Sequence, residues 1–392
     1  RRILKRFTGL FCVLALCLSM LPVSALAAED APSNQSTTLL SDDNVRKLGK
    51  RVPTLDEAVE AAEDGATIEL LADATTKGWN LTKSLTITSA PDLAEKPTVT
   101  FEKDGIALWG KTLTFKGIDV VMNGVGSTPY GEWTWMTICA SKDAVLALDN
   151  VNMTMDATGS TGSHAIYFCS NNKLNLTNGS VLTIKNYPND ALEWDGGDGG
   201  YNVNITNSTF ISDHNRSGFT GTFYATITNS KVDVVNSLGN GSNGSHFIIE
   251  DSEVNFNNNG SHGLSAGELS IDNSTVNTKN NNGMGITVNN AFTVENGSIV
   301  TVTGNAGNSS YGYAAVRLYN DYPFTVDSTS ELYIEDNNNT GLYVRQGNLT
   351  VEDGAVLKIT GNKVSHSLLD GYGGGIYVGY GNNYDPTVIL PA

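Results

Sequence analysis

The sequence has few cysteines, few basic residues and, beyond its N-terminal segment, no long apolar run, and each shortage excludes a class of protein. Of 4 cysteines in 392 residues, only Cys139 and Cys169 lie beyond that segment, too few for a disulfide scaffold. The 24 basic residues face 41 acidic ones, a net charge of −17 that disfavours nucleic acid and anionic membranes as partners. The later apolar runs are too short to span a membrane.

The N-terminal segment is typical of a secretory signal peptide. It has a basic start, an apolar run over residues 7–23 and the small-x-small pattern Ala-Leu-Ala at residues 25–27. We therefore predict that residues 1–27 are removed on export and that the protein is secreted or held at the cell surface. Loss of four basic residues and no acidic ones leaves 20 basic and 41 acidic residues, a net charge of −21.

A ten-residue phrase recurs at steps of 22 residues in the middle of the chain. It reads VNITNSTFIS, ATITNSKVDV, FIIEDSEVNF and LSIDNSTVNT, starting at residues 203, 225, 247 and 269. Apolar residues occupy places one and three, a small polar pair occupies places five and six, and alternation then resumes. Period-two alternation on both sides of a polar pair predicts a strand, a tight turn and a second strand. With looser spacing, copies extend from residue 113 to residue 358.

Place five is occupied mostly by Asn or Asp, which tolerate the left-handed backbone of a sharp turn. A third short strand, such as GITVN at 285–289 or GLYVR at 341–345, precedes each copy. Three strands in each turn of about 22 residues describe a chain wound into a coil, with equivalent strands about 4.8 Å apart. We predict an all-β fold of about 11 to 12 coils with an asparagine ladder. Asn229, Asp251 and Asn273 should then form a column of neighbours.

The ladder, the three strands and the coil length resemble the pectate-lyase-like right-handed parallel β-helix superfamily. The resemblance covers about residues 66–392. It implies the architecture but leaves function open, because the fold hosts lyases, hydrolases, adhesins and phage tailspikes. By this resemblance, the third strands and the variable loops that feed them correspond to the floor and wall of the substrate groove in pectate lyases. Since no capping element follows the last strand, we expect the β-helix to continue beyond Ala392.

Two segments are predicted to precede the β-helix. Residues 28–41 read as a polar linker, and residues 42–65 as a helical cap region. Thr54 is the expected N-cap residue, with Glu57 three residues later and Gly65 as the stop. A helix here would cover the open edge of the first coil, whose main chain would otherwise be unpaired.

Acidic residues and one histidine gather in two segments one coil apart, at 186–200 and 212–218. The candidates for catalysis are Asp190, Glu193, Asp195, Asp213, His214 and Arg216. Such groups can transfer a proton or bind a cation, for which Ca²⁺ is the candidate and Asp195 and Asp198 the candidate ligands. By the resemblance, Arg216 would imitate the arginine base of pectate lyases, although the local signatures of that family are absent. The alternative is that Asp, Asn and Gly simply form loops here.

A second group of candidates is aromatic and basic. The residues predicted to point outward from three successive third strands are Arg317, Tyr319, Tyr343, Arg345, Tyr377 and Tyr380. Flat rings beside guanidinium groups suit sugar faces or acidic groups. Equally, a tyrosine ladder could stabilise the sheet by cross-strand stacking. Tyr167 is predicted to point outward on the same face.

Two further features leave alternatives or point to a structural role. Cys139 and Cys169 occupy equivalent places on consecutive coils in the predicted register, so they form either a disulfide or two separate thiols. His262 lies in a motif similar to the Gly-His-Gly signature of polygalacturonases. That active site needs acids one and two coils earlier, where this chain has Asn240 and Gly218. We therefore predict that His262 belongs to a turn.

These features favour an exported, adhesin-like or structural β-helix that binds glycans or host proteins along the tyrosine and arginine residues. The alternative is a lyase or hydrolase that acts on acidic polysaccharide beside the same sheet. No organic cofactor and no nucleic-acid partner are predicted.

Overall fold

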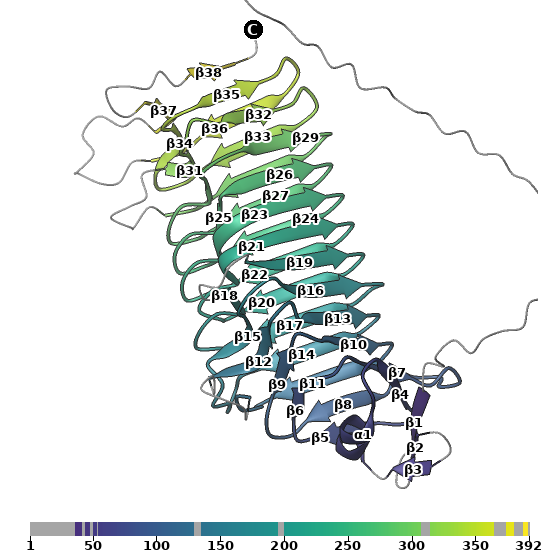
Figure 1. The fold of residues 1–392 in the computed structure, drawn as a ribbon. Coiled ribbons are helices and arrows are strands. Elements are labelled where there is room, and N and C mark those ends of the chain that lie inside the picture. The colour runs from purple at the N-terminus through teal and green to yellow at the C-terminus, as the bar shows by residue number, and fades with distance from the viewer. Residues whose placement is uncertain are drawn as a thin grey trace, which may run out of the picture. The chain divides into compact units, whose positions relative to one another are not determined.

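The computed structural model shows a right-handed parallel β-helix with three strands per coil (Figure 1), as predicted. It describes residues 36–40, 44–47, 50–52, 54–128, 135–194, 200–306, 314–363, 374–379 and 387–390, all within the unit Gln35–Ala392. The predicted signal peptide and the candidates Asp195, Asp198 and Tyr380 lie outside the described residues.

The first strands of the coils form face 1. In chain order they are β4 (Ala66–Leu70), β7 (Leu85–Ser89), β10 (Thr112–Lys116), β13 (Val145–Asp149), β16 (Asn172–Thr177), β19 (Tyr201–Thr206), β21 (Phe219–Thr228), β23 (Ser242–Glu250), β26 (Glu268–Asp272), β29 (Phe292–Glu295), β32 (Pro323–Val326), β35 (Asn348–Val351) and β38 (Thr387–Ile389). Both β21 and β23 begin on face 3 and continue into face 1, which joins face 1 and the earlier strands of face 3 into one hydrogen-bonded sheet, whereas the later strands of face 3 form a separate sheet of five strands.

The second strands form face 2, a separate sheet of 12 strands. They are β5 (Ala74–Thr76), β8 (Thr98–Phe101), β11 (Asp119–Asn123), β14 (Asn152–Asp156), β17 (Val181–Lys185), β20 (Thr209–Asp213), β22 (Lys231–Val235), β24 (Glu253–Asn257), β27 (Thr275–Lys279), β30 (Ile299–Thr303), β33 (Glu331–Glu335) and β36 (Val356–Thr360).

The third strands form face 3. They are β6 (Trp79–Leu81), β9 (Ile106–Trp109), β12 (Met136–Ser141), β15 (His164–Phe168), β18 (Leu192–Trp194), β25 (Leu264–Ala266), β28 (Ile286–Val288), β31 (Ala314–Leu318), β34 (Thr340–Val344) and β37 (Ile376–Val378).

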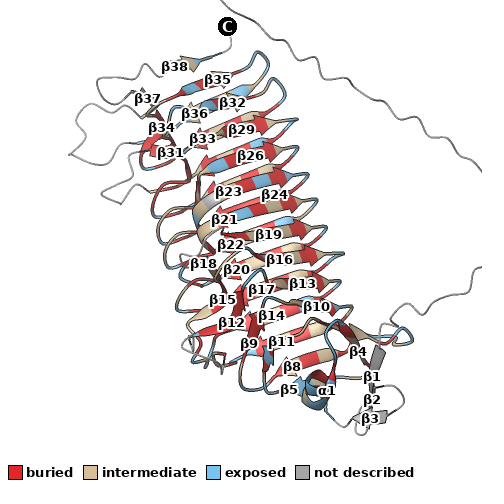
Figure 2. Cartoon of the chain, viewed as in Figure 1, coloured by how far each residue is buried: buried red, intermediate tan, exposed pale blue. Residues whose placement is uncertain are grey.

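The predicted register is confirmed by the strand pairing. Ala225 pairs with Phe247, and Phe247 pairs with Leu269, so a step of 22 residues is one coil. In the coils up to β35, alternate side chains of the strands point into the coil and most of them are buried, as the red bands of Figure 2 show, whereas β36 has no buried residue. Ile286 and Val288, predicted to point inward, are fully buried. The stacked apolar side chains therefore form one continuous core along the helix.

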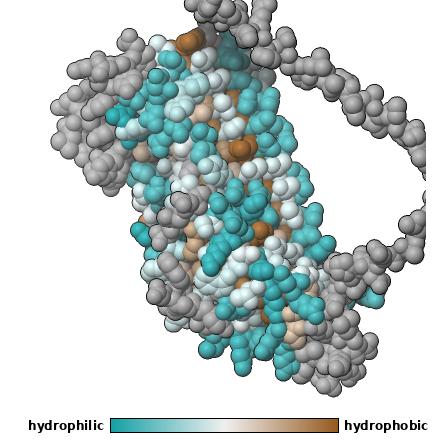
Figure 3. Space-filling model, in the orientation of Figure 1, coloured by the Kyte–Doolittle hydropathy of each residue, from teal (hydrophilic) through white to brown (hydrophobic). Residues whose placement is uncertain are grey.

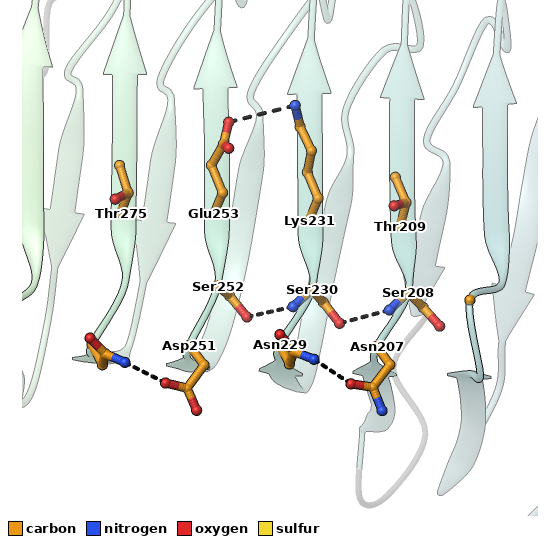
Figure 4. Close-up of a pocket in the computed structure, with 12 residues that line it drawn as sticks. Asn207, Ser208, Thr209, Asn229, Ser230, Lys231, Asp251, Ser252, Glu253 and Thr275 are labelled. Carbon is orange, nitrogen blue, oxygen red and sulfur yellow. Dashed lines mark hydrogen bonds and ion pairs between the residues drawn. The ribbon is translucent and has the colours of Figure 1, made fainter.

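The predicted asparagine ladder lies at the turn between face 1 and face 2, and we call it the outer ladder (Figure 4). Asn229 Nδ2 donates to Asn207 Oδ1 at 2.5 Å, and Asn273 Nδ2 donates to Asp251 Oδ1 at the same distance. All four residues have positive φ, between 43° and 50°. The column predicted from the repeat is confirmed. Asn and Asp suit this place because they tolerate the left-handed backbone of the turn.

A serine column that we did not predict runs beside the outer ladder. The main-chain N–H of Ser208 donates to Ser230 Oγ at 3.0 Å, and that of Ser230 donates to Ser252 Oγ at 3.0 Å. Each hydroxyl donates in turn to a main-chain carbonyl, as Ser230 does to Thr228 at 2.7 Å. The serine at place six of the repeat thus forms hydrogen bonds with main-chain groups of the turn that have no partner in a neighbouring strand.

A second asparagine column, which we call the inner ladder, lies buried at the turn between face 2 and face 3. It contains Asn259, Asn281, Asn305 and Asn337, each at most 1 % exposed. Asn281 Oδ1 accepts from the main-chain N–H of Asn259 at 2.9 Å and from its amide at 2.8 Å. Asn281 Nδ2 donates to the Phe256 carbonyl and to Asn305 Oδ1. Each inner amide thus connects three successive coils.

The N-terminal end is only partly as predicted. The helix α1 (Leu55–Ala61) starts at its expected N-cap, where the Thr54 hydroxyl accepts from the Glu57 N–H at 3.2 Å. In place of linker and further helix, the structure has the strands β1 (Ser36–Leu40), β2 (Asn44–Lys47) and β3 (Lys50–Val52). β1 pairs in parallel with β4 of the first coil. The open edge of β4 needs main-chain partners, which a strand supplies and a helix cannot.

The lowered pKa of Asp156, a residue of face 2, leads us to predict that the protein loses stability in acid. Burial alone raises the pKa of Asp156, but hydrogen bonds from Asn186, Thr158 and Lys185 outweigh it and hold the pKa at about 2. Because the folded pKa lies below the ordinary value of 3.8, the stabilisation is present above pH ~4 and is lost as the pH falls towards 2. We expect Asp156→Asn to lower the free energy of unfolding by about 1 kcal/mol at pH 6 and by less at pH 2.5. Thermal melts of both proteins from pH 6 to 2.5 measure this, and a difference that does not change with pH would contradict it.

Candidate functional site

Two carboxylates and a histidine meet on face 3, and we call them the carboxylate cluster. His164 begins β15, Glu193 lies on the neighbouring strand β18, and Asp190 lies two residues before β18. His164 Nε2 is 2.5 Å from Glu193 Oε2. One ligand atom from each of the three residues lies within 4.8 Å of the others. The cluster therefore contains groups that can move a proton or bind a cation.

Burial governs the electrostatics of the cluster. Asp190 is 3 % exposed, and its Oδ1 has no hydrogen-bond partner. Burial raises the pKa of Asp190, and the charge of Glu193 raises it further. The Ser217 hydroxyl and the charge of Arg216 act in the opposite direction. The Asp190 carboxyl consequently keeps its proton to a higher pH than an ordinary aspartate does.

The structure divides the catalytic candidates into two groups. Asp190 and Glu193 lie together, and Arg216 is close enough for its charge to act on Asp190. Asp213 and His214 instead pair with each other, 2.6 Å apart, at the end of β20. There Asp213 also accepts from the Asn236 amide at 2.8 Å, and the His214 side chain is 59 % exposed.

His164 was not among the predicted site residues. Its sequence context, Gly-Ser-His, occurs again at His246, which lies within β23, so the motif by itself did not point to a site. The sequence signal that could have found His164 is its position one coil before Asp190. The hydrogen bond from the Ala165 N–H to the Asp190 carbonyl shows that these positions lie on neighbouring coils. Equivalent positions of consecutive coils are neighbours in this fold, so the two side chains meet.

The described aromatic and basic candidates form a strip along β31, β34 and β37, which we call the tyrosine–arginine strip; its members are Arg317, Tyr319, Tyr343, Arg345 and Tyr377. Arg317, Tyr343 and Tyr377 pair in one column, as the alternation predicted. The Arg317 guanidinium carbon is 4.4 Å from the centre of the Tyr319 ring, and that of Arg345 is 4.0 Å from it. The strip therefore holds two cations against one ring.

Not all of the strip is accessible. The Tyr343 and Tyr377 rings lie 5.0 Å apart at 48°, which fits the stacking alternative. Tyr343 is only 5 % exposed, whereas Arg317, Tyr319 and Arg345 are partly exposed. Tyr377 is partly exposed as well, so Tyr343 is the buried member of the strip among its described residues; we call Arg317, Tyr319 and Arg345 the arginine end of the strip.

The equivalence predicted for the two cysteines is wrong by two residues. Cys139 pairs in register with Tyr167 instead of Cys169, and neither cysteine is in a disulfide. A hydrogen bond with Cys169, together with burial, raises the pKa of the Cys139 thiol. Tyr167 lies on the outer side of face 3, as predicted, but it is only 2 % exposed, because it packs against Cys139 and Met136.

His262 has the structural role that the sequence predicted. Its Nδ1 accepts from the Met284 N–H of the next coil at 3.0 Å, and its own N–H donates to the Asn240 side chain. Burial and the charge of Arg317 lower the pKa of His262. A neutral imidazole suits this acceptor role.

Two of the shallow hollows on the described surface lie apart from the carboxylate cluster and the strip. One, on face 1, contains the exposed Tyr224, whose ring stacks on that of His246 at 4.6 Å and 15°. The other follows the outer ladder, where Lys231 lies 3.5 Å from Glu253 (Figure 4). The face in Figure 3 is mostly hydrophilic, with separate hydrophobic spots instead of one continuous patch.

In the described part of the chain, every helix is too short or too polar to cross a membrane. Comparisons with known proteins add no relative: no family model matches the chain, and no curated protein or solved structure matches it significantly. The likeness to the pectate-lyase-like β-helices therefore remains one of fold.

Proposed function

We propose that this protein is an exported β-helix that binds acidic glycans through the arginine end of the tyrosine–arginine strip. The observation that carries the proposal is the placement of Arg317 and Arg345 within 4.4 Å of the Tyr319 ring. A guanidinium group binds a carboxylate or sulfate through two parallel hydrogen bonds, and a ring beside it gives a flat contact for a sugar. A rigid coil holds these groups in fixed positions before the ligand arrives.

Charge supports an anionic ligand over a neutral one. Two guanidinium groups near one ring repel each other, and an anion placed between them removes that repulsion. Basic residues are the minority in this chain, 24 against 41 acidic ones. A paired cationic site on such a surface selects acidic glycans by local contacts, since long-range attraction is absent.

Replacing Arg317 or Arg345 with glutamine tests the proposal. We expect each change to weaken binding of a carboxylated or sulfated oligosaccharide at least about tenfold, because each removes a charge-assisted pair of hydrogen bonds. A glycan array identifies the ligand, and calorimetric titration then measures the affinity of each variant.

Two control variants give the test its specificity. Lys358→Gln makes the same change of charge on face 2, where Lys358 pairs with Glu335 at 2.6 Å, and should leave affinity unchanged. Tyr224→Ala alters the hollow on face 1. Loss of binding in Tyr224→Ala with normal binding in both arginine variants would sink the proposal and move the site to face 1.

The carboxylate cluster favours a second candidate function, a lyase or hydrolase of acidic polysaccharide. Asp190, with its raised pKa, and Glu193 form the kind of carboxyl pair that glycosidases use as acid and base. Incubation with acidic polysaccharides separates the two functions, since only an enzyme releases new reducing or unsaturated ends.

A further inference from the structure

We propose that His164, Asp190 and Glu193 form a binding site for a divalent transition-metal ion of the zinc type. This site lies on β15 and β18, apart from the strands β31 and β34 that hold the arginine end of the strip. The proposal therefore does not depend on glycan binding. It rests on the directions of the hydrogen bonds around His164 and on the burial of Asp190.

The hydrogen bonds around His164 indicate which ring nitrogen carries a lone pair. The Ser163 hydroxyl donates to the Trp135 carbonyl at 2.9 Å, so its oxygen accepts from His164 Nδ1 at 3.0 Å. In the neutral ring, Nδ1 then carries the proton and Nε2 the lone pair, an assignment made from the bonding network. Nε2 is the atom that faces Glu193 Oε2 at 2.5 Å.

A neutral imidazole and an ionised carboxylate both present lone pairs at this contact. Two acceptors at 2.5 Å repel each other unless a positive charge lies between them, which is either a proton or a metal ion. A single proton between His164 and Glu193 would leave the second carboxyl group, that of Asp190, without a partner for Oδ1. Asp190 is 3 % exposed with Oδ1 unpartnered, and a buried carboxylate oxygen without a partner is costly. A divalent cation would satisfy all three groups together.

The donor set indicates the class of metal. One imidazole nitrogen and two carboxylate oxygens suit Zn²⁺ and its neighbours, whereas Ca²⁺ takes oxygen ligands almost only. In a tetrahedral site, ligand bonds of about 2.0 to 2.2 Å place neighbouring ligand atoms about 3.3 Å apart. Because Glu193 Oε2 now lies 2.5 Å from His164 Nε2, it would move away from His164 by about 1 Å when the metal binds. The Ser163 hydroxyl on Nδ1 holds the ring in the orientation that a metal ligand needs.

Zinc titration of the chelator-treated, folded protein tests the site, with a chromogenic chelator as competitor. We expect one Zn²⁺ per chain in the unaltered protein, and at least about tenfold weaker binding in His164→Gln and in Asp190→Asn. His246→Gln is the matched control, because His246 Nε2 lies 3.3 Å from Glu268 Oε2 in a comparable ion pair. No second carboxylate joins that pair among the described residues. This control should bind Zn²⁺ as the unaltered protein does.

Thermal melts guard against a variant that only folds poorly. Zn²⁺ should raise the melting temperature of the unaltered protein and of His246→Gln, and should leave that of Asp190→Asn, which nearly keeps the shape of the side chain, unchanged. Absence of stoichiometric Zn²⁺ binding would overturn the proposal. So would an equal loss in His246→Gln, or displacement of Zn²⁺ by Ca²⁺ at equal concentration.

Discussion

Replacing Asn281 with alanine is expected to lower the free energy of unfolding by about 4 kcal/mol. The substitution removes the amide that serves the Asn259 N–H, the Asn259 amide and the Phe256 carbonyl. These groups are buried, and each buried donor or acceptor left without a partner costs about 1 to 3 kcal/mol. A relaxed packing or a trapped water would recover part of the sum. Urea denaturation followed by circular dichroism measures the effect.

Asn277→Ala supplies the matched control in the same coil. Asn277 donates to Asn255 Oδ1 at 2.9 Å but is only partly buried, so water can replace the lost bond. We expect a cost below about 1 kcal/mol. Similar costs for the two variants would show that the inner ladder contributes no more than an ordinary surface amide. Since repeat arrays need not unfold in two states, the midpoint and the slope should both be compared.

Replacing Gly285 with alanine is expected to cost about 3 kcal/mol, although alanine adds a single carbon. Its Cβ would lie 2.5 Å from Val302 Cγ1 and 2.8 Å from Asn305 Nδ2, closer than real contacts allow. Overpacking of a filled interior costs about 1 to 3 kcal/mol, and displacement of the Asn305 amide would break ladder bonds as well. Thermal and urea unfolding both report this loss.

Gly297→Asn is the control for this second prediction. Gly297 has a φ of +79°, and an added Cβ would meet no atom within 4 Å. Asparagine accepts the left-handed backbone, so we expect a change of less than about 1 kcal/mol. If Gly285→Ala were as mild as Gly297→Asn, the inner ladder would not need glycine beside it.

The coil and the outer ladder could be predicted because their signals are local. Alternation and a polar pair recur at a fixed step, and that step alone sets the register of Ala225, Phe247 and Leu269. The inner ladder could not be predicted in the same way. Asn259 and Asn281 each lie in a run of three asparagines, at 257–259 and 280–282. Which of the three turns inward is decided by packing against neighbouring coils.

The candidate site was predictable only in part for a similar reason. Strand alternation places Glu193 and the arginine strip outside the core, and the structure agrees. Burial of outward side chains depends on segments from other coils. Trp135, for instance, lies beside Tyr167 with ring centres 6.5 Å apart, although 32 positions separate them in the sequence. The same long-range contacts bring His164 to Asp190.

The two asparagine ladders have opposite polarity along the coil axis. The amide-to-amide bonds of the inner ladder point towards the C-terminal coils, as from Asn281 to Asn305, while the same amide group also donates back to a main-chain carbonyl, that of Phe256. Those of the outer ladder point towards the N-terminal coils, as from Asn229 to Asn207. Their dipoles therefore oppose each other, unlike the peptide dipoles of an α-helix, which add. However many coils are stacked, these side chains build up little net potential at either end.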